Sequence, residues 1–290
     1  MPTNIGQNRY FREEGIVCCH CVSELDYNTN ALPSGVQQLM TCTREELLAA
    51  ANATLEVERF SDYCPNGLQV EGASVINKLV AGVTASQALL DEAVRAKADA
   101  ILVHHGYFWR GENPVLSGMK KRRITTLVNN DINLLAYHLP LDAHLELGNN
   151  AQLAAKLGLS VEGVASIEGQ DLLFHGLTSA PMSGLEFAHH IASRLDRAPL
   201  HIESDRAVSK VAWCTGGAQG YIEQAIELGV DAYITGEASE QTTHIAREAG
   251  IHFYAAGHHA TERYGVLALG RFLAERFKLD FEFVDIDNPV

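Results

Sequence analysis

The chain has 290 residues, 47% of them hydrophobic and 20% charged, and its formal net charge at pH 7 is −14. This length fits one large domain or two ordinary ones. The acidic excess argues against direct nucleic-acid binding, which needs a basic surface to displace counterions, and the absence of a run of about 18 apolar residues argues against a membrane span.

The segment 1–40 differs from the rest of the chain. It is polar at first, and Cys18-Cys19-His20-Cys21 follows without apolar periodicity. This cluster could bind a metal ion but lacks the two separated ligand pairs of a zinc site, so we favour an additional disordered tail. Met40 precedes a helix start, which leaves open a start codon there. Without a signal-like apolar core or a disulfide framework, we expect a cytoplasmic protein.

Residues 41–158 predict a first α/β part. Thr43 and Glu46 form a capping-box pattern that opens a helix over 45–55. Strands and helices then alternate, which is typical of βαβ units with a mainly parallel sheet. The strands are expected over 78–83, 99–103 and 132–137, and the helices over 87–97, 119–129 and 150–157. Asn149 is a plausible cap for the last helix.

Residues 159–207 predict a smaller α+β insert, with short strands near 163–176 and a helix over 184–195. Residues 208–290 return to the first pattern and predict a second α/β part. Its strands are expected over 211–215, 232–235, 251–255 and 281–285, and its helices over 221–228, 239–248 and 261–276. The fold class is therefore α/β, with two related α/β domains, mainly parallel sheets and this insert.

The two α/β parts resemble each other in sequence. The segments 90–102 and 222–234 align at a constant offset of 132 residues, which places His104-His105 opposite Gly236-Glu237. The next strand of each part is followed by a histidine and, four residues later, an acid: His138 with Asp142, and His258 with Glu262. A duplicated βαβ unit would bring these strand ends to one crevice.

Five of these residues predict a dinuclear metal centre. His104 and His105 end an apolar strand, so each imidazole could hold one ion if carboxylates approach it. A helix that begins near residue 260 would place His258 and Glu262 on one face. Since Pro140 disfavours helix at the preceding residue, we expect Asp142 on a loop. One carboxylate can bridge two ions and thereby activate a water, and mixed imidazole and carboxylate ligands favour zinc, iron or manganese.

Other candidates have weaker patterns. His138 fits a hydrogen-bond partner of a ligand at least as well as a ligand. Gly216-Gly217 lies between a strand and a helix and could bind a phosphate. Arg110 and Arg263 could meet an anionic substrate or form ordinary surface salt bridges. Four further histidines are weaker candidates: we expect His189 and His190 at exposed or subunit-contact positions, and His144 and His244 at solvated positions or as hydrogen-bond partners of ligands.

Several motifs together resemble the YbgI-like family, which carries the label GTP cyclohydrolase I type 2. They are the segment from Asp62 to Val70 (DYCPNGLQV), VHHG at 103–106, HLPLD at 138–142, Gly236-Glu237, and GHHATE at 257–262. The resemblance runs from about Met40 to the C-terminus. It implies two α/β domains, a toroidal homohexamer, and a dinuclear site with one ion on His104, Asp142 and Glu262 and the other on His105, His258 and Glu262.

The resemblance also implies a reaction: hydrolytic opening of the guanine ring of GTP, giving formate and dihydroneopterin triphosphate, with a possible link to damaged nucleotides. We therefore expect a metal-dependent hydrolase of a nucleotide-like substrate. Glu262 would bridge two divalent ions, a metal-activated hydroxide would attack purine C8, and His138 or Glu237 would carry protons. The alternatives are a metal-dependent phosphoesterase and a non-catalytic, ring-forming metal-binding adaptor.

Overall fold

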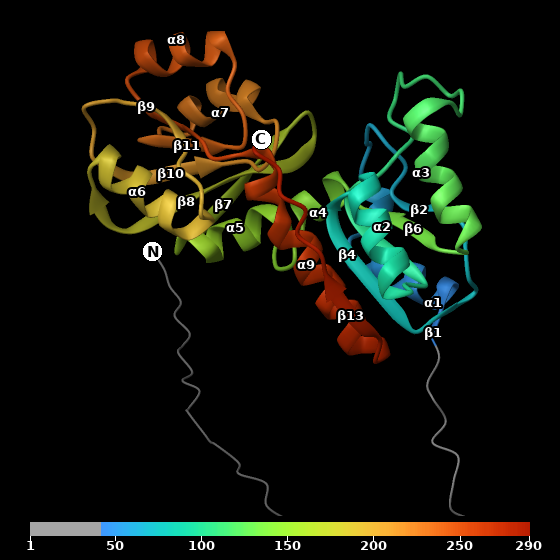
Figure 1. Ribbon diagram of the computed structural model, residues 1–290. Helices are drawn as coiled ribbons and strands as arrows, with labels where there is room; N and C mark the ends of the chain where they lie inside the picture. Colours follow the sequence, from blue (N-terminus) through green and yellow to red (C-terminus); the bar gives the residue numbers. More distant parts are fainter. Residues whose placement is uncertain (1–41) are drawn as a thin grey trace, which may run out of the picture. The chain divides into compact units, whose positions relative to one another are not determined.

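The computed structural model of the protein describes residues 42–290 (Figure 1). The predicted tail of residues 1–40, with its Cys18-Cys19-His20-Cys21 cluster, lies outside these residues, as does Met40. Within the described part, no helix is both long and apolar enough to cross a membrane. Two large sheets, each with a parallel centre, organise this part of the chain.

The first sheet has the order β13-β4-β5-β6-β2. Its strands β13, β4, β5 and β6 are parallel, and β2 is antiparallel to β6 at the edge. The strands are β2 (Gly67–Val70), β4 (Lys78–Thr84), β5 (Ala100–His105), β6 (Asn133–Ala136) and β13 (Asp280–Phe283). The associated helices are α1 (Arg44–Thr54), α2 (Gln87–Ala96) and α3 (Gly118–Asn129). A separate two-stranded sheet pairs β1 (Cys42–Thr43) with β3 (Val75–Ile76).

The second sheet has the order β7-β8-β10-β11-β12-β9. Its centre, β10-β11-β12, is parallel, and antiparallel strands flank it on both sides. The strands are β7 (Ser160–Ile167), β8 (Gln170–Met182), β9 (Leu200–Ile202), β10 (Val208–Trp213), β11 (Ala232–Thr235) and β12 (His252–Ala255). The associated helices are α6 (Gly184–Leu195), α7 (Ile222–Glu227) and α8 (Glu240–Ala249).

Three further helices connect the sheets: α4 (Leu139–Ala143), α5 (Asn149–Leu157) and α9 (His258–Phe277), with short 3-10 turns η1 (Val57–Arg59) and η2 (Gln219–Tyr221). The long helix α9, dark red in Figure 1, begins directly after β12 of the second sheet. It packs on β4 and β5 of the first sheet and leads into β13. The helix α9 thus connects the carboxyl end of β12 in the second sheet to one face of the first sheet.

The predicted fold class is confirmed: the chain forms two α/β domains with parallel sheet centres. The sheet pairing nevertheless crosses the predicted ranges. The strands of the expected insert, β7 and β8, extend the second sheet, whereas β13 pairs in parallel with β4 of the first. Asn149 is not a cap either, because Gly148 precedes the helix and Asn149 is its first residue. The division into three ranges stays a prediction.

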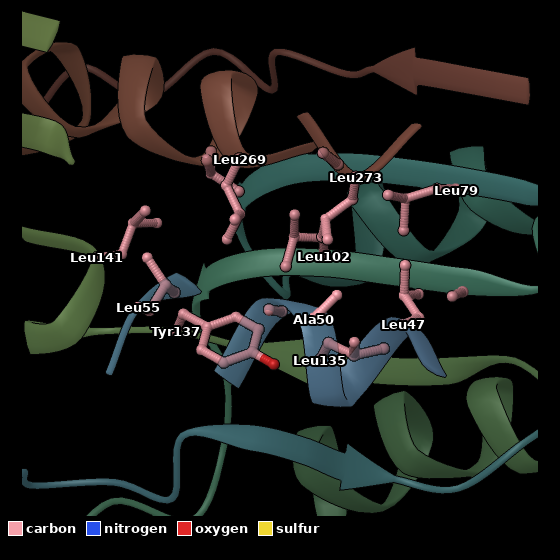
Figure 2. Close-up of a cluster of buried hydrophobic side chains, with 14 of the residues drawn as sticks. Leu47, Ala50, Leu55, Leu79, Leu102, Leu135, Tyr137, Leu141, Leu269 and Leu273 are labelled. Carbon is pink, nitrogen blue, oxygen red and sulfur yellow. The ribbon is translucent and has the colours of Figure 1, made fainter. Parts of the chain in front are cut away.

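The first sheet is closed on one face by α1 and α9. Figure 2 shows Leu269 and Leu273 of α9 near Leu79 and Leu102 of the strands, all of them fully buried. Complete burial of such side chains contributes roughly 1.5–3 kcal/mol each. The capping box at the start of α1 is confirmed, since Thr43 Oγ1 accepts from the backbone of the third helical residue. This core fixes the strand ends that carry the candidate site.

Candidate metal centre

The histidine pair stands at the carboxyl end of β5, between parallel β4 and β6. His104 is fully buried, and its Nδ1 is 2.8 Å from the carbonyl oxygen of Tyr137. Because a carbonyl only accepts, this contact makes Nδ1 the donor and leaves Nε2 as the ligand atom. His105 Nδ1 lies 3.2 Å from Thr84 Oγ1. The centroids of the two imidazole rings are 4.5 Å apart, so the two side chains could bind two neighbouring metal ions.

Asp142 reaches the site from a short helix, and the expectation of a loop is wrong. The helix α4 begins at Leu139, and Pro140 stands within its first turn. A proline is tolerated there because the first backbone N–H groups of a helix have no partner within it. Asp142 is buried, and its Oδ1 accepts from Asn149 Nδ2 at 2.8 Å and from Thr215 Oγ1 at 3.3 Å.

The helix α9 supplies the other two residues in its first turns. It begins at His258, earlier than predicted, so His258 and Glu262 are one helical turn apart on one face. His258 Nε2 lies 3.1 Å from Glu262 Oε2. Glu262 is only 3% exposed, a degree of burial that carboxylates tolerate when cations or hydrogen bonds compensate them.

All five predicted ligand residues come together, in two groups that share Glu262. The ligand atoms of each group lie within 4.8 Å of one another: His104, Asp142 and Glu262 in one, and His105, His258 and Glu262 in the other. His104 Nε2 is 3.5 Å from Glu262 Oε1, whereas His105 Nε2 is 3.3 Å from Glu262 Oε2. Glu262 therefore presents one oxygen to each group, and both groups could hold a metal ion.

Two local features indicate that the residues fit metal ions. Glu262 Oε2 is buried and makes no hydrogen bond in the described part of the chain. Leaving such an oxygen without a partner is costly, and a bound cation would compensate it. Gly216 has a φ of +71°, and a Cβ there would lie 2.0 Å from Glu262 Oε1. The backbone is thus packed directly against the shared carboxylate, which a larger residue would displace.

The charges within the centre are strongly coupled. Burial lowers the pKa of His104, but the carboxylates of Asp142 and Glu262 outweigh it and raise the pKa to about 10. Burial lowers the pKa of His105 to about 3. Burial also lowers the pKa of His258, but the adjacent carboxylate of Glu262 outweighs it and raises the pKa to about 9. The neighbouring imidazoles hold the pKa of Glu262 well below its usual range despite burial. Glu262 is therefore an anion, as a ligand must be.

Two histidines at the centre are held through Nδ1 by carboxylates. His258 Nδ1 is 2.7 Å from Glu237 Oε1, and His138 Nδ1 is 2.7 Å from Asp62 Oδ1. Glu237 was expected as a proton carrier, and the structure places it where it orients His258. Asp62 was missed as a site residue, although it begins the DYCPNGLQV motif, because its partner lies 76 residues away.

Asp62 does not itself belong to a metal group. Its oxygens accept from Asn66 Nδ2 at 2.8 Å and from Leu139 N at 2.9 Å, besides His138. Although Asp62, Cys64 and His138 lie close enough together to hold an ion, a carboxylate so fully engaged has little left to offer one. These hydrogen bonds, with the charge of His138, lower the pKa of Asp62 to about 2, although burial opposes them.

A cavity of about 490 Å³ opens onto the centre. At its base are His105, Asp142, His258 and Glu262, and His138 also lines it. Its walls are mainly aromatic and apolar, and they include Tyr63, Trp109, Leu139, Leu172, Cys214 and Tyr221. This volume suits a small organic molecule that reaches the candidate centre with one end.

The remaining candidates are not among the proposed metal ligands. Arg263 forms a salt bridge of 3.1 Å with Asp285, as the alternative reading expected, and Arg110 donates to the carbonyl of Asp62 at the cavity rim. Gly216 packs against Glu262 and is followed by η2, and the phosphate site stays a prediction. The other histidines have local partners or are exposed: His144 accepts from backbone N–H groups, His189 is exposed, His190 contacts the carbonyl of Leu157, and His244 pairs with Glu240.

Comparisons with known proteins show the family of the chain. Residues 42–289 match the family model described as Duf34/NIF3 (NGG1p interacting factor 3). A "GTP cyclohydrolase 1 type 2 homolog" of Pseudomonas aeruginosa is 57% identical over 251 residues, which cover 86% of this chain and 100% of that protein. The protein of the same name from Salmonella typhimurium is 59% identical over 246 residues, covering 84% and 98%. The solved structure of protein ybgI, described as of unknown function, has a TM-score of 0.83 and 56% identity, covering 86% of this chain and 100% of that one.

Proposed function

Since the chain belongs to the Duf34/NIF3 family, we propose that it is a dinuclear metal-dependent hydrolase that acts on a nucleotide-like substrate. The observation that carries the proposal is the position of Glu262, which offers one oxygen to each of two histidine and carboxylate groups. The name of the relatives, GTP cyclohydrolase 1 type 2 homolog, supports hydrolytic opening of the guanine ring of GTP with release of formate.

In this proposal one divalent ion binds His104, Asp142 and Glu262, and the other binds His105, His258 and Glu262. Zinc, iron and manganese suit such ligands. When bound, the ions supply Lewis-acid polarisation of a substrate oxygen and lower the pKa of a water. The chain holds the ligands in place through partners behind them: the Tyr137 carbonyl on His104 and Glu237 on His258.

His138 is the residue to which we assign proton transfer. Because Asp62 is ionised and accepts from Nδ1, it fixes the tautomer in which Nε2 of His138 is the basic nitrogen. The His138 ring is 5.1 Å from that of His104 and lines the cavity, so Nε2 can accept a proton from an attacking water. Glu237, engaged with His258, then acts by positioning that ligand.

The proposal is tested on the purified full chain, loaded in turn with zinc, iron or manganese. Metal content is measured by mass spectrometry, and formate and phosphate release are followed with GTP, other nucleotides and simple phosphoesters. About two ions per chain with formate release from GTP would support the proposal. Phosphate release without formate would favour the phosphoesterase alternative, and bound metal without any turnover would favour the adaptor.

Three further expectations belong to the same proposal. These are the ring-shaped homohexamer, the cytoplasmic location and a role with damaged nucleotides. Native mass spectrometry of the full chain tests the first, because a hexamer has six times the 31.6 kDa mass of the chain. A damaged-nucleotide role predicts faster consumption of oxidised purine nucleotides than of GTP, followed by chromatography of the nucleotide itself, because an oxidised C8 would not leave as formate.

A further inference from the structure

The walls of the cavity bring aromatic rings together from separate parts of the chain. Tyr63 precedes β2, Trp109 follows β5, and Tyr221 ends η2 on the side of the second sheet. Between them the lining is largely apolar. Of the residues described as lining this cavity, none is a lysine or an arginine. The walls therefore offer flat, largely apolar surfaces.

The turn that carries Trp109 is held in a fixed conformation. Phe108 has a φ of +65°, a left-handed conformation that costs a bulky residue on the order of 1–3 kcal/mol. One carboxylate oxygen of Glu112 stabilises the turn by accepting from the backbone N–H groups of Phe108 at 3.1 Å and Trp109 at 3.2 Å. The Trp109 indole N–H donates to the carbonyl of Gly106 at 3.3 Å. The indole is thus placed at the cavity before any ligand binds.

Tyr63 is tied to the same turn. The backbone N–H of Arg110 donates to the Tyr63 carbonyl at 2.6 Å, and its guanidinium donates to the Asp62 carbonyl at 2.9 Å. The guanidinium carbon also lies 5.8 Å from the centre of the Tyr63 ring. Despite these contacts Tyr63 remains 47% exposed, which leaves much of its ring free for a ligand. A fixed, half-exposed tyrosine beside a functional cavity is typical of a binding surface.

The two rings flank the proposed proton carrier. The centroid of His138 is 5.0 Å from that of Trp109 and 6.4 Å from that of Tyr63, and both pairs are edge-on. A ligand that touches Tyr63 and Trp109 therefore lies beside His138. It is also close to the base of the cavity, where His105 and Glu262 are exposed to it.

We propose that Tyr63 and Trp109 bind a planar heteroaromatic ring of the substrate and present it to His138 and the candidate metal centre. This proposal rests on the proposed function and deepens it, because it selects substrates with a base-like ring over simple sugar phosphates. The imidazole and carboxylate groups at the base face one another as candidate metal ligands, so ring contacts must supply much of the recognition. Stacking of a base on an aromatic side chain contributes about 1–3 kcal/mol, which corresponds to roughly 5- to 150-fold in affinity.

The experiment measures binding of guanosine and of ribose 5-phosphate to the full chain by equilibrium dialysis, with and without zinc. Trp109→Ala and Tyr63→Ala are each expected to weaken guanosine binding by at least about 5-fold. Trp109→Phe and Tyr63→Phe, which keep a ring, should restore most of the affinity. Leu116→Ala is the control, since Leu116 lies on the same segment before α3, is 49% exposed and does not line the cavity. Its affinity should stay within about 2-fold of the unchanged chain.

Fluorescence gives an independent measurement, because the chain has only two tryptophans and Trp213 is fully buried. Guanosine should change the emission of the unchanged chain and leave that of Trp109→Phe unaltered, whereas ribose 5-phosphate should change neither. Guanosine binding that is equal in Trp109→Ala, Tyr63→Ala and the unchanged chain would overturn the proposal, as would preferential binding of ribose 5-phosphate.

A result against ring binding by Tyr63 and Trp109 can be distinguished from a result against the proposed function. If guanosine binding depends on Trp109 but the chain releases no formate from GTP, ring binding is supported and the cyclohydrolase reaction is contradicted. If Trp109→Ala and the unchanged chain release formate from GTP with the same KM, the cyclohydrolase reaction is supported and ring binding by Trp109 is contradicted.

Discussion

The centres of the two sheets are built alike, but they contribute different chemistry to the candidate site. In each, three parallel strands are followed by loops and helices at their carboxyl ends: β4-β5-β6 in one and β10-β11-β12 in the other. The third strand of each is followed by a histidine whose Nδ1 lies 2.7 Å from a carboxylate oxygen. The repeat expected from the sequence is thus visible as a common arrangement.

The difference lies in what stands at the other strand ends. At the carboxyl end of β5 there are two imidazoles, His104 and His105, whereas the aligned residues just after β11 are Gly236-Glu237. A Cβ on Gly236 would lie 2.6 Å from the backbone of His258, and Gly216 is similarly crowded by Glu262. The first half therefore supplies two imidazoles and Asp142, and the second supplies His258 and the shared carboxylate of Glu262 with the space that it needs. A common scaffold can be diversified at its strand ends without changing its core.

The largest effect is expected from removing the residue that both groups share. Glu262→Gln keeps the side-chain size but loses the anionic ligand, so both ions should be lost and formate release should stop. Metal analysis after dialysis checks this. Asp142→Asn, the corresponding change in the first half, should reduce the metal content only to about one ion per chain. Equal metal content in both variants would contradict a shared ligand.

Asp62 and Glu237 each hold a histidine through Nδ1, but their replacement should affect different properties of the protein. Loss of Asp62 should lower the catalytic rate, and loss of Glu237 should lower the metal affinity. Asp62→Asn is expected to lower kcat by about 10²- to 10⁴-fold, because His138 would lose the partner that fixes its reactive nitrogen. The metal content should stay unchanged, since His138 is not one of the proposed ligands. A loss of metal together with activity would mean that Asp62 supports the centre itself.

Glu237→Gln should act on the metal instead. Loss of a carboxylate behind a ligating histidine typically lowers metal affinity by about 10- to 100-fold. Competition with a chelator measures the affinity, and excess metal should then restore activity. If excess metal leaves activity low, Glu237 has a part in proton transfer, as the sequence allowed.

Gly216→Ala and Gly217→Ala form a matched pair. The first substitution forces a left-handed residue, at about 1–2 kcal/mol, and drives its Cβ against Glu262, whereas the nearest atom to the second is 3.6 Å away. Urea unfolding should therefore show a lower free energy of unfolding for Gly216→Ala alone. Metal content should fall in the same variant. Indistinguishable variants would contradict the close packing.

The smallest effects should be alike in the two halves. Thr43 and Ser183 each begin a helix with a capping box, at α1 beside the first sheet and α6 beside the second. Their replacement by alanine is expected to lower the free energy of unfolding by about 1 kcal/mol in each case. Urea unfolding of both variants checks this. A much larger effect at one of them would show that the two halves differ in local stability.

The alternation of strands and helices and the five candidate metal ligands could be predicted from the amino-acid sequence. Those signals are local. An apolar run ending in His104-His105 predicts a strand end, and the spacing from His258 to Glu262 predicts one helical face. The capping box at Thr43 is likewise contained within four residues. Such patterns depend on periodicity and on short-range hydrogen bonds, which the order of residues specifies directly.

The pairing of segments that are far apart in the sequence could not be predicted from local patterns and is seen in the fold alone. The contact of Asp62 with His138 spans 76 residues, and β13 returns to the first sheet although it follows the second along the chain. Local propensity carries no information about such pairings, because they depend on which buried surfaces pack together. Pro140 shows the same limit on a smaller scale: its residue type disfavours a helix interior, yet its place in the first turn of α4 makes it acceptable and brings Asp142 to the site.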